Sequence, residues 1–210
     1  NGSQYFCALS VSAAAGLYAT SMAIALLPQR VELGQFSGNV VLGAPTQNSV
    51  KANIYSSDQS GTVSISYGLQ SSVYPQKTAS ASLTAGQPLE MSLDQLQADA
   101  RYYYRVNFQA SGSTNSGPAA EANFHTARAA GSEFVFTIQG DSHPERPNEF
   151  NASLYQRGLA TAALDLSDFH ICLGDDFSVD TLNSGTVTQS QVAERYSIQR
   201  PYLGMIGRVA

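Results

Sequence analysis

Short apolar runs fill the chain between residues 40 and 128, and Gly, Ser, Asn and Asp residues separate them. Within several of these runs apolar and polar positions alternate, which is the period of a half-buried strand. Regular spacing of such runs is typical of a sandwich of two antiparallel sheets. The expected strands are residues 40–42, 50–55, 62–67, 89–93, 102–108 and 122–126.

A different pattern begins after a short junction at residues 129–132. Residues 134–138 and 169–173 are almost continuously apolar, as in strands that are buried on both faces of a parallel sheet. Between them, residues 151–166 carry apolar side chains at helical spacing. A strand, a helix and a strand in this order predict a βαβ unit, whose two strands run parallel.

One more helix is expected at residues 189–199, and Pro201 is expected to end it. The chain thus changes from closely spaced strands to alternating strands and helices. This change predicts a multi-domain protein with an all-β part followed by the start of an α/β part.

The first segment of the chain has its own character. Residues 5–27 contain no charged side chain and are rich in small and apolar residues. We interpret residues 1–35 as an export leader and linker, the leader being either a cleaved signal peptide or an uncleaved membrane anchor. A buried helix of the folded protein is the alternative. The leader implies a secreted or periplasmic protein, with no stable membrane span unless the leader stays uncleaved.

Composition and charge narrow the classes of function. The 210 residues are 43% hydrophobic and carry a net charge of −5, which is typical of a folded protein. The chain has no basic stripe that could neutralise a phosphate backbone, so bulk nucleic-acid binding is not expected. The two cysteines, Cys7 and Cys172, lie in segments of different character and do not predict a disulfide framework.

Candidate chemistry lies at the ends of the two parallel strands. Each strand is followed by a Gly-Asp pair, Gly140-Asp141 and Gly174-Asp175, and His143 comes two residues after the first aspartate. Ligands of open α/β sheets bind at the carboxyl ends of strands, where glycine lets the chain turn sharply. Two carboxylates at one edge repel each other unless a cation lies between them. Carboxylate and imidazole together favour zinc, iron or manganese over calcium.

The tyrosine-rich run at residues 96–106 resembles fibronectin type III domains and the similar domain that precedes the catalytic domain of purple acid phosphatases. The resemblance implies an immunoglobulin- or fibronectin III-like sandwich over residues 36–128. It also implies that Tyr102 is a corner tyrosine, whose hydroxyl bonds back to the preceding loop.

The second resemblance rests on Asp141-Ser142-His143 and Gly174-Asp175. These motifs resemble the opening motifs of calcineurin-like metallophosphoesterases, purple acid phosphatase-like or PhoD-like. The resemblance implies that Asp141 and His143 hold one metal ion and that Asp175 bridges two. Residues 133–210 would be the truncated first part of the α/β metallophosphoesterase domain, so the catalytic residues and remaining ligands are expected beyond residue 210. Ser178 stands where purple acid phosphatases carry an iron-ligating tyrosine.

The function implied by this family is hydrolysis of phosphomonoesters or phosphodiesters by a hydroxide bound to two divalent or trivalent ions, zinc, iron or manganese. The partner would be a small-molecule phosphoester, and the truncated chain is expected to be inactive alone. Two alternatives stay open. One is an extracellular binding or adhesion protein with a non-catalytic second domain, and the other is a metal-dependent nuclease or nucleotidase on the same scaffold.

Overall fold

The computed structural model describes residues 8–9, 19–20, 36–114, 116–182 and 185–206, in two units that comprise residues 1–33 and 34–210. In the first unit, β1 (Ala8–Leu9) pairs antiparallel with β2 (Ala19–Thr20). Apart from these short strands, the expected export leader lies outside the described residues. No helix in the described part of the chain is both long and apolar enough to cross a membrane.

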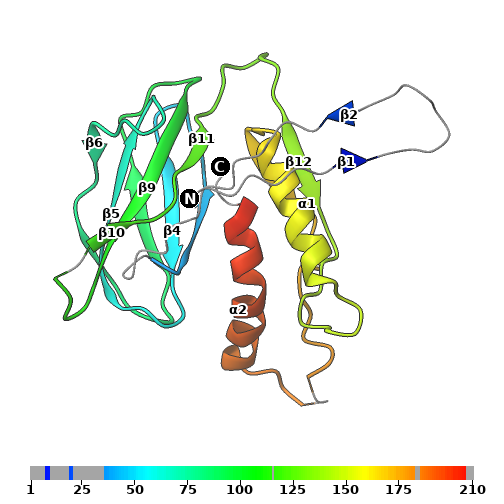
Figure 1. The fold of residues 1–210 in the computed structure, drawn as a ribbon. Helices are drawn as coiled ribbons and strands as arrows, with labels where there is room; N and C mark the ends of the chain where they lie inside the picture. Colours follow the sequence, from blue (N-terminus) through cyan, green and yellow to red (C-terminus); the bar gives the residue numbers. More distant parts are fainter. Residues whose placement is uncertain (1–7, 10–18, 21–35, 115, 183–184, 207–210) are drawn as a thin grey trace. The chain divides into compact units, whose positions relative to one another are not determined.

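Two antiparallel sheets form the first part of the second unit (Figure 1). One has the order β3-β4-β8, with β3 at Asn39–Gly43, β4 at Val50–Tyr55 and β8 at Leu89–Leu93. The other is built around β5 (Gly61–Gly68) and β9 (Arg101–Ala110), which pair along their length. Its remaining strands are β6 (Gln76–Lys77), β7 (Ala81–Leu83), β10 (Ser116–Pro118) and β11 (Ala122–His125).

Alternation of side chains explains why these sheets pack together. In β9 every second residue is buried, and these residues are Tyr102, Tyr104, Val106 and Phe108. They join apolar side chains of the other sheet, such as those of β4, in one hydrophobic core. Because strand side chains point alternately to opposite faces, each sheet presents one apolar face to this core. The expected β-sandwich is confirmed.

Tyr102 closes a corner of this sandwich. Its side chain is 2% exposed, its ring stacks on Phe124, and its hydroxyl oxygen accepts a hydrogen bond of 2.9 Å from the backbone N–H of Gln97. The loop before β9 is therefore held by the first inward-facing residue of that strand. The predicted contact of a corner tyrosine with its preceding loop is confirmed.

The second part of the unit is a βαβ arrangement. Strand β12 (Phe136–Gln139) pairs parallel with β13 (Phe169–Cys172), and helix α1 (Ala152–Leu164) lies between them in the chain. The side chain of Asn151 caps the helix by accepting from the N–H of Leu154 at 3.0 Å. The predicted parallel strand pair is confirmed by this register.

The expectation that these strands are buried on both faces is wrong for the described chain. Phe134, Phe136 and Ile138 are 57%, 43% and 51% exposed. The described residues give this sheet only two strands. Each strand therefore has one neighbouring strand, and few side chains lie next to its apolar residues. The rings of Phe134, Phe136 and Phe169 instead contact one another, with centroids 5.5–5.9 Å apart.

Helix α2 (Gln189–Ile206) also differs from expectation, because it continues through Pro201. Proline lacks the N–H that the carbonyl of Ser197 would accept, and this loss normally interrupts a helix. Tertiary contacts hold the helix on either side. Arg200 donates from Nε to Oδ1 of Asn39 at 2.6 Å and from Nη2 to the carbonyl of Asn53 at 2.7 Å. A Cβ on Gly204 would lie 2.5 Å from that of Asn39, so glycine allows the close approach.

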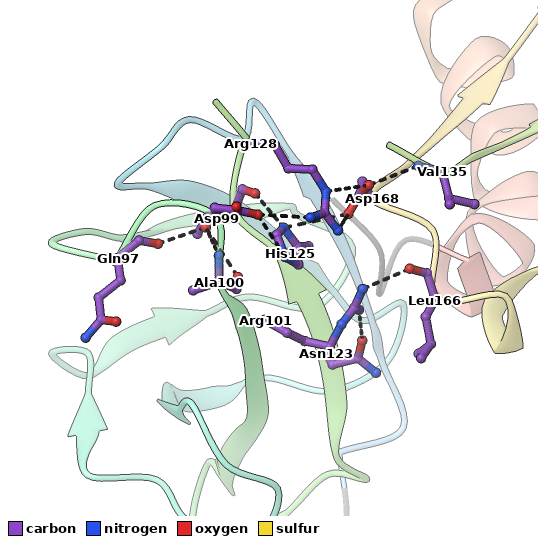
Figure 2. Close-up of polar contacts among 11 residues, drawn as sticks. Gln97, Asp99, Ala100, Arg101, Asn123, His125, Arg128, Val135, Leu166 and Asp168 are labelled. Carbon is purple, nitrogen blue, oxygen red and sulfur yellow. Dashed lines mark hydrogen bonds and ion pairs between the residues drawn. The ribbon is translucent and has the colours of Figure 1, made fainter. Parts of the chain in front are cut away.

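A second polar junction links the sandwich to the start of both parallel strands (Figure 2). Arg128 donates to Asp168 from Nε at 3.0 Å and from Nη2 at 3.1 Å, and to Asp99 from Nη1 at 3.0 Å. Asp168 also accepts from the N–H of Val135 at 3.0 Å, and its own N–H donates to the Val135 carbonyl. Buried His125 lies 3.6 Å from carboxylate oxygens of both Asp99 and Asp168.

The expected division of the chain at residues 128–133 stays a prediction. The two junctions show that the sandwich and the βαβ part make specific polar contacts within the unit of residues 34–210. Hydrogen bonds between charged groups form only in a narrow geometry, because each donor needs an acceptor at one position.

Replacing Tyr102 with phenylalanine should lower the free energy of unfolding by about 1–2 kcal/mol, because the N–H of Gln97 loses its acceptor while the ring still packs. Urea denaturation followed by circular dichroism measures this change. Tyr103→Phe is the matched control, since Tyr103 is half-buried on the other face of the same strand. Equal stability of the Tyr102 and Tyr103 variants would reject the corner role.

The Arg128–Asp168 junction should make stability depend on acid pH. Burial alone raises the pKa of Asp168, but hydrogen bonds from Arg128 and Val135 and the nearby charges of Arg128 and His125 outweigh it, so the pKa is lowered. The carboxylate therefore stabilises the fold above its unfolded pKa of about 3.9, and this contribution disappears as pH falls through the lower folded value. Urea midpoints between pH 7 and pH 2 should fall less steeply in Asp168→Asn than in the wild type. Parallel curves would contradict this.

Candidate metal centre

The parallel register brings the two Gly-Asp pairs to one edge of the sheet. Gln139 lies opposite Cys172, so β12 and β13 end at the same level. The N–H of Asp141 then donates to the carbonyl of Gly174 at 3.1 Å, which joins the two loops directly. The loops after β12 and β13 are therefore neighbours, as the sequence predicts.

All three predicted ligands have left-handed backbone conformations. The φ angles are 55° at Asp141, 43° at His143 and 51° at Asp175, and Gly174 has a φ of 98°. Residues with a Cβ rarely adopt positive φ, and five other non-glycine residues of the described chain also do so, which marks these segments as tight turns. The tight turns direct three side chains toward one place at a cost in backbone strain.

Asp141, His143 and Asp175 each offer one ligand atom, and these atoms lie within 4.8 Å of one another. Nε2 of His143 is 3.0 Å from Oδ1 of Asp141. The two aspartates are exposed and His143 is half-buried, so a metal ion could enter from solvent. Ligand bonds of roughly 2.0–2.2 Å place neighbouring ligand atoms about 3 Å or more apart, which fits this cluster.

The orientation of His143 supports a cation at this position. Its Nδ1 lies 2.9 Å from Oε1 of Glu145, an ionised carboxylate that can only accept, so Nδ1 donates. In a neutral imidazole the lone pair of Nε2 then faces the carboxylate of Asp141. Two acceptors in contact repel, and either a proton on Nε2 or a metal ion between the two groups removes that repulsion, so the contact is compatible with a bound cation. The residues present therefore fit a metal ion.

Glu145 is a site residue that the sequence did not single out. Its side chain is fully buried and accepts hydrogen bonds from His143 and from the N–H of Ser178. Burial raises its pKa, but these hydrogen bonds outweigh burial, so the pKa is lowered and the carboxylate is ionised. The sequence feature that could have indicated Glu145 is an acidic residue two positions after a candidate metal-binding histidine, because carboxylates commonly orient such histidines.

A buried polar network supports the same loops. The hydroxyl of Ser142 donates to the carbonyl of Asp176 at 3.1 Å and lies 3.5 Å from Oε1 of Gln199 in α2. The side chain of Gln199 is fully buried and donates to the hydroxyl of Tyr155 at 3.4 Å. Helix α2 thus contacts the loop that carries Asp141 and His143.

Nearby charged residues are engaged with one another. Arg146 donates to Asp180 at 2.8 Å and to the hydroxyl of Ser178 at 3.2 Å, and that hydroxyl also donates to Asp180. Ser178 therefore takes part in hydrogen bonds between the loops.

His125 and His170 are not part of the metal-ligand cluster that is found among the described residues. Nδ1 of His170 lies 2.8 Å from the hydroxyl of Thr137, and Nδ1 of His125 lies 2.7 Å from the carbonyl of Thr126. Burial lowers the pKa of His170, which favours its neutral form. Their contacts are those of structural residues in the strands.

Comparison with known proteins supports a likeness in fold. No protein-family model matches the chain, and no curated protein matches its sequence. A solved structure of PhoD is 16% identical with a TM-score of 0.54, and the match covers 85% of this chain and 40% of the PhoD chain. The chain therefore spans less than half of the PhoD structure that it resembles.

Fibronectin type III domains are also among the similar solved structures. That of human contactin 1 is 12% identical, with a TM-score of 0.36, over 49% of this chain and 87% of that domain. That of the human collagen α-1(XX) chain is 21% identical, with a TM-score of 0.36, over 49% of this chain and 94% of that domain.

Replacing Gly174 with alanine should lower the free energy of unfolding by about 1–2 kcal/mol, because a Cβ disfavours the left-handed backbone. No atom lies within 4 Å of the added Cβ, so the cost would come from the backbone alone. Gly158→Ala in α1 has equally open surroundings and should instead stabilise by about 0.5–1 kcal/mol. Urea denaturation measures both, and a neutral or stabilising Gly174→Ala would contradict the strained turn.

Proposed function

We propose that this protein is a metal-dependent phosphoesterase that hydrolyses phosphomonoesters or phosphodiesters. The observation that carries the proposal is the meeting of Asp141, His143 and Asp175 at the carboxyl edge of two parallel strands, where Nε2 of His143 faces a carboxylate. The likeness in fold to PhoD supports it.

The charge of the site explains why metal ions are needed. Carboxylates repel a phosphoester, so an anionic substrate requires cations at this edge. We assign Asp141 and His143 to one ion and Asp175 to a bridging position between two ions of zinc, iron or manganese, following the resemblance to calcineurin-like enzymes. When bound, such ions supply activation of the attacking water and stabilisation of charge on the phosphoryl oxygens.

The residues of this chain would hold and orient the ligand atoms. The left-handed turns bring the two aspartates to one place, and the contact with Glu145 leaves Nε2 of His143 free to face a metal ion. The remaining ligands and the proton donor are proposed to lie beyond residue 210, so these 210 residues should bind metal measurably but less tightly than a complete site, and show no turnover.

The proposed partner is a small-molecule phosphoester outside the cytoplasm, since residues 5–27 have the composition of an export leader. A metal-dependent nuclease or nucleotidase would use the same ligands, and the net charge of −5 favours small substrates over nucleic acid. A binding or adhesion protein with a non-catalytic second domain would have no need of the metal ions.

The proposal predicts that this chain binds Zn²⁺ or Mn²⁺ and that Asp175→Asn and His143→Ala each reduce affinity at least tenfold, because the first removes the charge of a ligand and the second removes a ligand. Isothermal titration calorimetry measures stoichiometry and affinity. Asp94→Asn, which neutralises an exposed carboxylate of the sandwich, is the control and should bind like the wild type.

Absence of binding by the wild type, or unchanged affinity in both ligand variants, would contradict the proposal. In protein that extends beyond residue 210, Asp175→Asn should damage hydrolysis of an aryl phosphate more than His143→Ala, since a bridging carboxylate serves both ions. Comparing an aryl phosphate, nucleotides and DNA as substrates separates the phosphatase from the nuclease or nucleotidase.

A further inference from the structure

We propose that Glu145 is a positioning residue of this site, which fixes the imidazole of His143 for metal binding and ties the loop after β13 to the same point. The inference rests on the proposed metal-dependent function. It concerns a residue outside the three ligands, whose carboxylate lies behind His143 and not beside the ligand atoms.

Burial makes the position of Glu145 informative. Its side chain is 0% exposed, and a buried carboxylate is unfavourable unless partners compensate for the lost water. One oxygen, Oε1, is 2.9 Å from Nδ1 of His143 and accepts from the N–H of Ser178 at 2.9 Å. The compensation therefore comes from the two loops that carry the metal ligands.

The hydrogen bonds of Glu145 satisfy only one of its two carboxylate oxygens. Oε2 of Glu145 is buried and has no hydrogen-bond partner among the described residues. Nor does Arg146 satisfy the charge closely, because its Nε lies 3.8 Å from Oε1 and its Nη2 is 2.8 Å from Asp180. An unpaired buried oxygen costs stability. A role in orienting His143 explains why a carboxylate occupies this position despite that cost.

The contact decides which nitrogen of His143 is available. A carboxylate that accepts from Nδ1–H leaves the lone pair on Nε2, the atom that faces Asp141. The negative charge also makes the imidazole a stronger ligand, and removal of such partners commonly weakens metal binding 10- to 100-fold. Without Glu145 the ring could rotate or carry its proton on Nε2.

The same oxygen couples the two loops. Ser178 follows Asp175 by three residues, so its bond to Glu145 fixes the segment that presents the second aspartate. A single buried carboxylate thus sets the distance between the ligands contributed by the loop after β12 and the ligand contributed by the loop after β13.

Glu145→Gln keeps an oxygen for both donors but removes the charge, whereas Glu145→Ala removes both. We expect Glu145→Gln to keep a cooperative melt without metal but to bind Zn²⁺ about tenfold more weakly, and Glu145→Ala to bind at least as weakly as Glu145→Gln. Glu149→Gln is the matched control, because Glu149 also pairs with Arg146, at 3.6 Å, but is 71% exposed. It should bind Zn²⁺ like the wild type.

A second measurement does not depend on any variant folding. Nitrogen-15 NMR of the wild-type chain, at a pH at which the His143 ring is neutral, should show the proton on Nδ1 before Zn²⁺ is added and Zn²⁺ on Nε2 afterwards. A proton on Nε2 of neutral His143, or Glu145→Gln with wild-type affinity for Zn²⁺, would overturn the role of Glu145 while leaving the proposed function intact. Failure of the wild type to bind Zn²⁺ or Mn²⁺ would instead overturn the proposed function.

Discussion

The parallel pairing of β12 with β13 is the constraint on which the candidate site depends. Because the register sets Gln139 opposite Cys172, the two chains leave the sheet at one level and their loops meet through the bond from Asp141 to Gly174. A shift of one residue would turn every side chain of one strand to the other face. The ligand cluster is thus a consequence of strand register as much as of residue type.

The start of each strand is fixed as well as its end. Asp168 immediately precedes β13 and exchanges hydrogen bonds with Val135, which immediately precedes β12, and Arg128 from the end of the sandwich pairs with the same carboxylate. The sandwich therefore does more than precede the βαβ part in the chain. Its last residues hold the strand pair in the register that the site requires.

Helix α2 makes a second connection between the sandwich and the site. Arg200 binds Asn39 and Asn53 of the sandwich, and the adjacent Gln199 lies within the polar network beneath Ser142. Consecutive helical residues point about 100° apart, so one turn of a helix can face both regions. These buried contacts also explain how the helix tolerates Pro201, because the bonds of Gln199 and Arg200 before the proline and the packing of Gly204 on Asn39 after it offset the bond that it removes.

Local patterns in the sequence predict the sandwich, the parallel strand pair and the places of Asp141, His143 and Asp175. These patterns are alternation in β9, continuous apolar runs in two strands, and glycine before each aspartate. The corner role of Tyr102 came from the resemblance to fibronectin type III domains. Which family of enzyme uses such motifs came from resemblance, and metal binding itself stays a proposal.

Packing of distant segments sets the roles of Glu145, Ser178 and Gln199, the course of α2 through Pro201, and the exposure of Phe136 on its strand. A glutamate in a loop is ordinarily solvated, and the adjacent residues do not predict that a second loop will bury it. Proline and apolar residues likewise carry average tendencies, which contacts from distant parts of the chain reinforce or override. Burial and partnership are properties of the packed chain, so they cannot be read from local spacing alone.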